Sequence, residues 1–413
     1  MIVHEIHDMK ILTISVAYPP EIRSASHLIQ ELAEELRDRG HTITVATCYP
    51  HYNLAENISK EEYSECSFEA GIRVIRIHTP PHHKVNFIIR GLSQLTLSYF
   101  FQSKIRKYLN DGVDAVVVYS PPLPLWKVGQ FVKETYRARF VLNIQDIFPQ
   151  NAVDLGVLRN PLLIRFFERM ERKAYRYADV VTVHSPSNGE FLLKQRKVPV
   201  SKLVTLYNWV HVGAYEEPRN SGFYRNRLHL EKAFIVFFGG VLGPSQGLDL
   251  IVDAAKEIQH LEEIVILITG DGMEKDRLMK QTRRADLKNV IFHPFVSKEE
   301  YGKLLREVDV GLVCLTAKNK TPVVPGKILG YMAAGIPVLA LLNRESDGHQ
   351  IIHEARCGYS DIPDNPQKAA QMIIKMYEEK DRLKELGLNG YQYAVKNFSR
   401  KVCVDKLEDL LRA

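Results

Sequence analysis

Short runs rich in β-branched residues alternate with segments of helical period along the chain, and this alternation constrains the fold more than any other feature. Parallel sheets covered by helices have this sequence form. The runs fall into two sets, so we predict an α/β protein of two doubly wound, Rossmann-like domains facing a cleft. The predicted strands are 11–16, 42–46, 74–77, 115–119, 140–144 and 180–183, then 234–238, 264–269, 290–292, 310–314 and 338–342.

The length of the chain supports the same division. A chain of 413 residues is longer than one hydrophobic core usually supports. A charged segment with Gly and Pro, ending near residue 227, precedes a fresh apolar run. We therefore place the boundary within 208–212 and expect an N-terminal domain over 1–208 and a C-terminal domain over 209–390.

Composition excludes several classes of protein. The chain is 45% hydrophobic and 25% charged, which is ordinary for a globular protein. Its 5 cysteines are widely spaced, so neither a disulfide framework nor a zinc site is indicated. No apolar run is long enough to span a membrane, and the first residues do not read as a secretory signal. We expect a protein of the reducing cytosol without a bound metal.

The positive charge has one notable concentration. The formal net charge is +6, and the stretch 84–107 interleaves basic residues with aromatic and aliphatic ones and contains no acidic residue. Such a stretch can lie on an anionic membrane surface, or it can be a core helix with a solvated basic face. Both readings stay open. Nucleic acid is not an expected partner, because no recognised binding module accompanies the charge.

The segment 323–340 reads as a loop, a short helix and a buried strand. Pro325 suits a first helical position and Gly335 the left-handed residue after the last turn. Lys327 stands at the start of this helix beside Gly326. Free amides at a helix N-terminus and a nearby ammonium group favour an anion, so this segment predicts a phosphate site.

Two glycine turns follow predicted strands of the second domain. Gly239 and Gly240 come after the run 234–238, where small residues would let backbone amides approach a diphosphate. Gly270 and Asp271 come after the run 264–269. The alternatives are a plain tight turn for the first pair and a helix cap for Asp271.

Carboxylates follow buried strands at two other places. Asp146 comes just after the run 140–144, where it could orient an acceptor hydroxyl or partly deprotonate it. Its alternative role is a helix cap. Glu345 and Asp347 follow the run 338–342, one loop from Lys327, with a solvated capping loop as their alternative.

Three segments, 143–149, 237–249 and 323–340, together resemble the family 4 retaining glycosyltransferases, which have the GT-B fold and nucleotide-sugar donors. The likeness is greatest to bacterial members that build O-antigen, capsule and exopolysaccharide, fucosamine transferases among them. The resemblance implies that Lys327 stabilises the departing diphosphate, that Asp146 holds the acceptor, and that 391–413 returns to the N-terminal domain. The implied donor-side residues are Gly239, Gly240, Gly270, Asp271, Pro325, Gly326 and Gly330, and the implied acceptor-side residues are Arg23 and Ser24.

The chain departs from the family pattern at the ribose site. Gly330 stands where many members carry the glutamate that holds the donor ribose, and Pro322 stands where a second glutamate is common. Glu345 or Asp347 could replace the missing carboxylate. The family's Gly-Gly pair in the first loop is replaced by Arg23 and Ser24, so Arg23 could instead supply positive charge.

We therefore expect a retaining glycosyltransferase that moves a sugar from a nucleoside diphosphate, UDP-sugar being the expected donor class, to a hydroxyl of a polyprenyl-linked or polysaccharide acceptor. The enzyme would serve cell-surface glycan synthesis, in the cytoplasm or peripherally on the inner face of the cytoplasmic membrane. No metal or other cofactor is implied. A sugar-nucleotide 2-epimerase and a non-catalytic, donor-binding subunit are the alternatives.

Overall fold

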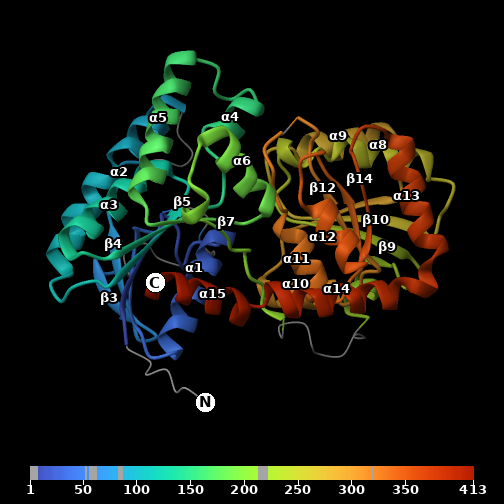
Figure 1. Cartoon of the computed structure of the whole chain (residues 1–413). Helices are drawn as coiled ribbons and strands as arrows, with labels where there is room; N and C mark the ends of the chain where they lie inside the picture. Colours follow the sequence, from blue (N-terminus) through green and yellow to red (C-terminus); the bar gives the residue numbers. More distant parts are fainter. Residues whose placement is uncertain (1–7, 52–53, 55–62, 82–86, 213–221, 319) are drawn as a thin grey trace. The chain divides into compact units, whose positions relative to one another are not determined.

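The computed structural model describes residues 8–51, 54, 63–81, 87–212, 222–318 and 320–413. The chain forms two compact units (Figure 1). Unit 1 consists of Met1–Asn208 and Arg400–Ala413, and unit 2 is Trp209–Ser399. Each unit has its own sheet and its own hydrophobic core.

Unit 1 is built on an 8-stranded sheet in the order β3-β4-β2-β1-β5-β6-β7-β8. All neighbouring strands are parallel except β3 and β4. The strands predicted from the sequence are confirmed, whereas β3 and β8 were not foreseen, because they are short and lack a buried apolar run. The bounds are β1 Lys10–Ile14, β2 Thr42–Cys48, β3 Cys66–Glu69, β4 Ile72–Ile77, β5 Ala115–Ser120, β6 Arg139–Ile144, β7 Val180–Val183 and β8 Leu203–Thr205.

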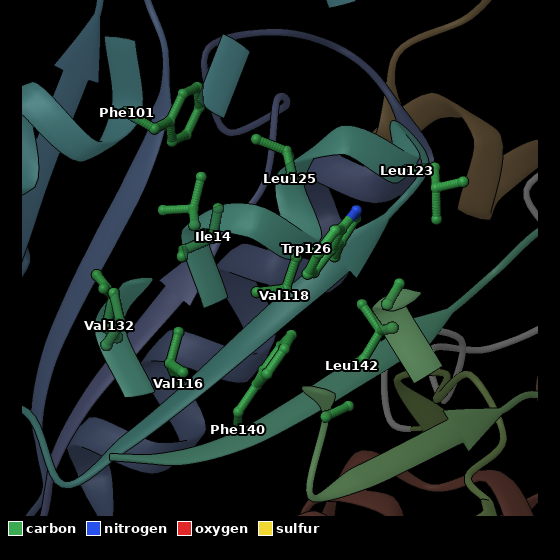
Figure 2. Packing of buried hydrophobic residues seen from close by; sticks show 14 of the residues in the cluster. Ile14, Phe101, Val116, Val118, Leu123, Leu125, Trp126, Val132, Phe140 and Leu142 are labelled. Carbon is green, nitrogen blue, oxygen red and sulfur yellow. The ribbon is translucent and has the colours of Figure 1, made fainter. Parts of the chain in front are cut away.

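Helices cover both faces of this sheet, with α1 and α15 packed together and α2, α3 and α5 sharing the main core. Apolar side chains fill that core: Phe101 of α2, Val132 of α3 and Phe140 of β6 are fully buried (Figure 2). The bounds are α1 Ser24–Asp38, α2 Phe87–Tyr108, η2 Leu123–Leu125, α3 Trp126–Tyr136, α4 Gln150–Asp154, α5 Pro161–Tyr177, α6 Pro186–Arg196, η3 Val200–Lys202 and α15 Arg400–Arg412.

Unit 2 is built on a 6-stranded sheet, all parallel, in the order β11-β10-β9-β12-β13-β14. The predicted strands are confirmed, and β14 was missed because its sequence, Gly-Tyr-Ser-Asp, has no apolar run. One sheet is wholly parallel, and the other is parallel except between β3 and β4. The predicted pair of Rossmann-like domains is therefore confirmed. The strands are β9 Phe234–Gly239, β10 Ile264–Thr269, β11 Val290–His293, β12 Val310–Cys314, β13 Val338–Leu341 and β14 Gly358–Asp361.

The helices of unit 2 connect these strands and flank the sheet. In this sheet the chain runs outward from β9 through β10 and β11 on one side, and from β12 through β13 and β14 on the other. The bounds are α7 Phe223–Leu228, η5 Pro244–Gln246, α8 Asp249–Glu257, α9 Lys275–Arg284, α10 Lys298–Leu305, α11 Gly326–Ala333, α12 Gly348–Ala355, α13 Pro366–Glu378, η6 Lys380–Arg382 and α14 Leu383–Phe398.

The C-terminal segment is divided between the units. Ser399 has extended dihedrals (φ −61°, ψ 145°) and ends α14, which packs against α11 and α12 of unit 2. The next helix, α15, packs against α1 of unit 1, where Arg39 lies 2.9 Å from a carboxylate oxygen of Glu408. Of the range 391–413, which the resemblance assigned to the N-terminal domain, Arg400–Ala413 belong to unit 1, whereas 391–399 belong to unit 2.

Among the described residues, no helix is both long and apolar enough to cross a membrane.

Candidate active site

The loops after β9 and β12 meet at the point where the strand order of unit 2 reverses. In open α/β sheets, ligands bind outside the carboxyl ends of the strands at such a switch point. The amide of Thr316, after β12, donates to the carbonyl of Ser245, after β9, over 2.9 Å. The segment after β12 leads directly into α11, so the start of α11 belongs to the same site.

Lys327 lies at this switch point. Its Nζ donates to Oε1 of Gln246 over 2.9 Å and lies 4.9 Å from the ring centroid of Phe238. Desolvation lowers the pKa of Lys327 to about 8, with a small opposing contribution from Cys314. The side chain therefore remains mostly charged at neutral pH. Because burial has already removed much of the water around the ammonium group, an anionic ligand would displace little water on binding.

The start of α11 differs in one detail from the prediction. The helix begins at Gly326, and Pro325 is its N-cap rather than its first helical residue, because the ψ of Pro325 is extended at 124°. No side chain caps this end. Gly326 is exposed, and a Cβ added to it would meet no atom within 4 Å. The helix start is thus open to a ligand.

Tyr331 fixes α11 against the sheet. Its buried hydroxyl accepts from the amide of Gly239 over 3.3 Å and lies 3.2 Å from the carbonyl oxygen of Phe237. A Cβ on Gly311 would lie 2.4 Å from the Tyr331 ring, so the close fit needs glycine in β12. Tyr331 therefore positions both Lys327 and the end of β9.

The surroundings of Gly239 and Gly240 bear on their predicted role as a diphosphate turn. Their amides already have protein partners, the hydroxyl of Tyr331 and the carbonyl of Thr269. Gly240 has a φ of +138°, and a Cβ there would lie 3.0 Å from Cε of Lys327. The missing side chain leaves the space along which Lys327 extends.

Gly270 and Gly272 lock the β10 loop onto the β9 loop. Gly270 has a φ of +146°, and a Cβ would lie 1.9 Å from the carbonyl oxygen of Gly240. A Cβ on Gly272 would lie 2.4 Å from the carbonyl oxygen of Leu242. Leu242 in turn donates its amide to the carbonyl of Asp271 over 2.8 Å. The loops after β9 and β10 are therefore packed closely against each other.

The carboxylate of Asp271 points into solvent. It lies 3.6 Å from Nζ of Lys275, and its side chain is 75% exposed. The N-cap of α9 is Glu274, not Asp271, so the capping alternative does not hold. The carboxylate is free to meet a ligand at the carboxyl edge of β10.

Glu345 and Asp347, the two candidates to replace the family glutamate, differ in exposure. Glu345 is exposed and accepts only a long hydrogen bond, 3.3 Å, from Nδ2 of Asn343. Asp347 is buried and occupies the N-cap position of α12 without a side-chain cap bond. Gly330 faces open space, since a Cβ there would meet nothing within 4 Å.

A second group of polar residues gathers at the carboxyl ends of β5, β6 and β7 in unit 1. Asp146 follows β6, is exposed, and does not cap α4, whose N-cap is Pro149. Although part of its side chain reaches solvent, desolvation by the surrounding protein raises the pKa of Asp146, and His184 opposes that rise. Burial, with Asp146 next, raises the pKa of Tyr119. An acceptor hydroxyl would meet a base and a phenol here.

Arg23 and Ser24 lie at the start of α1. Arg23 is its N-cap and places Nη1 3.4 Å from the buried carboxylate of Glu21. Arg23 also lowers the pKa of Tyr119, against the effect of burial. Ser24 is the first helical residue and is exposed. Arg23 and Asp146 thus both act on the pKa of Tyr119, in opposite directions.

Sequence reasoning missed residues that complete these sites. Tyr119 and His184 stand at the carboxyl ends of β5 and β7, a position that could have marked them. Gln246 and Tyr331 were not among the predicted site residues. Nothing in the sequence shows that Gln246 accepts from Lys327, since the contact spans 81 positions.

The basic stretch 84–107 falls mainly on α2. Residues 84–86 lie outside the described residues, as do the side chains of 87–90 and 92. In the rest of the helix, Leu97, Phe101 and Ile105 are fully buried. Lys104 pairs with Glu65, and the guanidinium of Arg106 lies 4.6 Å from the ring centroid of Phe131. These contacts favour the core-helix reading for the described part.

Two family profiles match the chain. Residues 25–209 match the profile described as "Glycosyl transferase 4-like domain", and residues 222–393 match "Glycosyl transferases group 1". Together they span most of both units. The chain is a group 1, GT4-like glycosyltransferase.

Similar proteins agree with this assignment. The chain is 25% identical to an Escherichia coli protein named "Putative colanic acid biosynthesis glycosyl transferase WcaI", over 79% of this chain and 82% of that protein. Sucrose-phosphate synthase from Thermosynechococcus elongatus superposes with a TM-score of 0.76 at 15% identity, over 98% of both chains. Anabaena HepE in complex with UDP-glucose gives 0.71 at 19% identity, over 98% of this chain and 99% of that one. These likenesses show the predicted GT-B fold.

Proposed function

We propose that the protein transfers a sugar, with retention of configuration, from a UDP-sugar to a hydroxyl of a lipid-linked or polysaccharide acceptor in cell-surface glycan synthesis. The observation that carries the proposal is the position of Lys327. Its partly desolvated ammonium lies at an open helix start, at the switch point of a parallel sheet. In a glycosyltransferase, the anion that such a site would bind is the diphosphate leaving group.

The chemistry follows from where charge develops. As the bond from the sugar to the diphosphate breaks, negative charge grows on the phosphate oxygens. Lys327 and the amides at the start of α11 stabilise that charge, and a preorganised donor of this kind contributes about 3 kcal/mol to a transition state. Tyr331 and the locked glycine loops keep these groups in place before the donor arrives.

On the acceptor side, Asp146 would orient the attacking hydroxyl, with Tyr119 and His184 beside it. The donor nucleotide would lie along the loops after β9 and β10, near Asp271, with Glu345 as the candidate ribose ligand. The UDP-glucose complex of Anabaena HepE, which shares the fold, supports UDP as the nucleotide. The colanic acid relative supports a role in polysaccharide synthesis, and a fucosamine-transferase-like donor specificity is the finer proposal.

The proposed place of action is the inner face of the cytoplasmic membrane, where a polyprenyl-linked acceptor would be met. The test is UDP release. Purified protein is incubated with a panel of nucleotide sugars, with and without a membrane lipid extract, beside the Lys327→Ala variant. Release that requires one donor and the extract supports transfer. Conversion of a donor without any acceptor would replace the proposal by a 2-epimerase, and binding without turnover would replace it by a non-catalytic subunit.

A further inference from the structure

The outer side of α5 in unit 1 has an unusual composition. Its first half exposes large apolar side chains, with Leu162 at 72%, Phe166 at 45% and Leu163 at 41%. Its second half exposes cationic side chains. We name this set the α5 surface. It consists of Leu162, Leu163, Arg165, Phe166, Arg169, Arg172, Lys173 and Arg176.

The apolar part of the α5 surface is not used to build the core. Met170, Ala174 and Tyr175 make the buried contacts of the helix. Phe167 lies with its ring centroid 5.0 Å from that of Phe148, while the ring of its neighbour Phe166 contacts Phe167 at 5.2 Å and remains 45% exposed. Adjoining exposed apolar side chains of this size mark an interaction site rather than chance exposure.

The cations of the α5 surface have no counterions in the part of the chain that the structure describes. None of them forms an ion pair there, whereas Lys133 of α3 pairs with Asp179 at 2.6 Å. The two acidic residues of α5 leave most of this charge uncompensated: Glu171 is buried and bonded to Arg196, and Glu168, beside Arg165 and Arg172 along the helix, forms no ion pair with a described residue. Positions 165, 169, 172 and 176 follow the i, i+4, i+7, i+11 spacing of one helical face. The face therefore suits an extended anionic partner.

A groove of about 700 Å³ lies along α5 against α3 and continues this surface. Its apolar lining includes Trp126, Phe131 and Met170. Its charged lining has five cations, Lys127, Arg169, Arg172, Lys173 and Arg176, and one carboxylate, Glu134. An apolar body flanked by ammonium and guanidinium groups matches the chemistry of a lipid at a bilayer surface, with acyl chain inside and phosphate outside.

We propose that the α5 surface docks the protein on an anionic lipid bilayer. Leu162, Leu163 and Phe166 enter the boundary between head groups and acyl chains, and the cations meet the lipid phosphates. A row of flexible charges fits a fluid array of head groups, which needs no fixed geometry in its partner. This assignment replaces 84–107 as the membrane contact, because the described cations of α2 have partners within the protein.

The docking surface is connected to the proposed acceptor site. Phe148, two residues after Asp146, packs on Phe167 of α5 with ring centroids 5.0 Å apart. If the proposed transfer to a lipid-linked acceptor holds, docking through α5 would bring that acceptor near Asp146. The docking itself does not depend on sugar transfer, so the two proposals can fail separately.

The test is flotation of the full chain with vesicles of phosphatidylcholine alone or mixed with phosphatidylglycerol. Wild type should bind the anionic vesicles, and binding should fall as salt rises. The charge variant is Arg169→Gln, Arg172→Gln, Lys173→Gln and Arg176→Gln combined, expected to weaken binding about fivefold per removed cation. The apolar variant, Leu162→Ser with Phe166→Ser, should weaken it about tenfold.

A matched control removes the same net charge from unit 2. Lys280→Gln, Arg283→Gln, Arg284→Gln and Lys288→Gln change exposed residues of α9 and the following loop that also lack a described ion pair. This control should keep binding within about twofold of wild type. Equal losses in the control and the charge variant, or failure of wild type to bind anionic vesicles, would overturn the proposal.

A second measurement covers the case in which a variant does not fold. Thermal unfolding of each variant, followed by far-UV circular dichroism, reports whether unit 1, which carries α5, is intact. Amide hydrogen exchange of wild type should slow across 161–177 when anionic vesicles are added, and unchanged exchange there would also overturn the proposal.

Discussion

The Lys327 ammonium donates a 2.9 Å hydrogen bond to the side-chain oxygen of Gln246, so the cation of the donor site is held in place before any ligand binds. A neutral amide oxygen is a weak counterpart for an ammonium group compared with a carboxylate. In the proposed donor site, a phosphate would therefore replace Gln246 as the partner of Lys327 at little cost.

Lys327→Ala should lower sugar transfer by ~10²-fold or more, because the ammonium group would stabilise charge that appears mainly in the transition state. UDP release in a single-donor assay is the measurement. Lys288→Ala, at an exposed lysine of the same unit, is the control and should leave the rate unchanged. Equal rates for the two variants would remove Lys327 from the catalytic group.

UDP affinity should fall as pH rises through about 8. Desolvation lowers the pKa of Lys327 to about 8 in the free protein, and a bound diphosphate favours the charged form. Binding is then at full strength below that pKa, and above it each complex must take up a proton. Calorimetric titration with UDP across the range checks this, and Lys327→Met should give a flat profile over the same interval.

Gly330→Glu should tighten UDP binding several-fold. A Cβ at this position meets no atom within 4 Å, so the side chain has room, and the resemblance places a ribose-binding glutamate here. Gly330→Ala is the matched control. Both changes should stabilise α11 by about 0.5–1 kcal/mol through helix propensity, but only the glutamate should improve UDP affinity. A smaller gain with 2′-deoxy-UDP would locate the effect at the ribose.

Gly270→Ala should destabilise unit 2 by about 2 kcal/mol or more. Its φ of +146° is unfavourable for alanine, and the new Cβ would lie 1.9 Å from a backbone oxygen of Gly240, which cannot move without opening the loop pair. Thermal unfolding is the measurement. Gly326→Ala, at an open position, serves for comparison and should leave the melting temperature nearly unchanged.

Asp146→Asn should slow transfer by 10²-fold or more while leaving UDP affinity unchanged. An amide keeps the size of the carboxyl group but can neither accept a proton nor orient a hydroxyl with a full charge. Kinetics with a saturating acceptor and a separate UDP titration distinguish the two effects. If UDP affinity falls along with the rate, Asp146 would act on the donor or on folding instead.

Much of the scaffold follows from local sequence. Buried parallel strands are continuous apolar runs, so the central strands such as β9 and β10 could be located within a residue or two. The edge strands β3, β8 and β14 were not predicted, because strands at the edge of a sheet are partly exposed and carry polar residues. Asp146 and Lys327 could be singled out because each follows a buried strand or opens a helix.

The sequence alone determined the α/β class, the two Rossmann-like domains and the segments at which a site would form, since these depend on periodicity and on residues near one another in the chain. Only the tertiary structure decided what the candidate residues contact. The bonds from Lys327 to Gln246 and from Gly239 to Tyr331 span 81 and 92 positions. The need for glycine at 240 and 270 arises from contacts between loops. Such contacts exist only once the parallel strands are paired side by side, which no local pattern encodes.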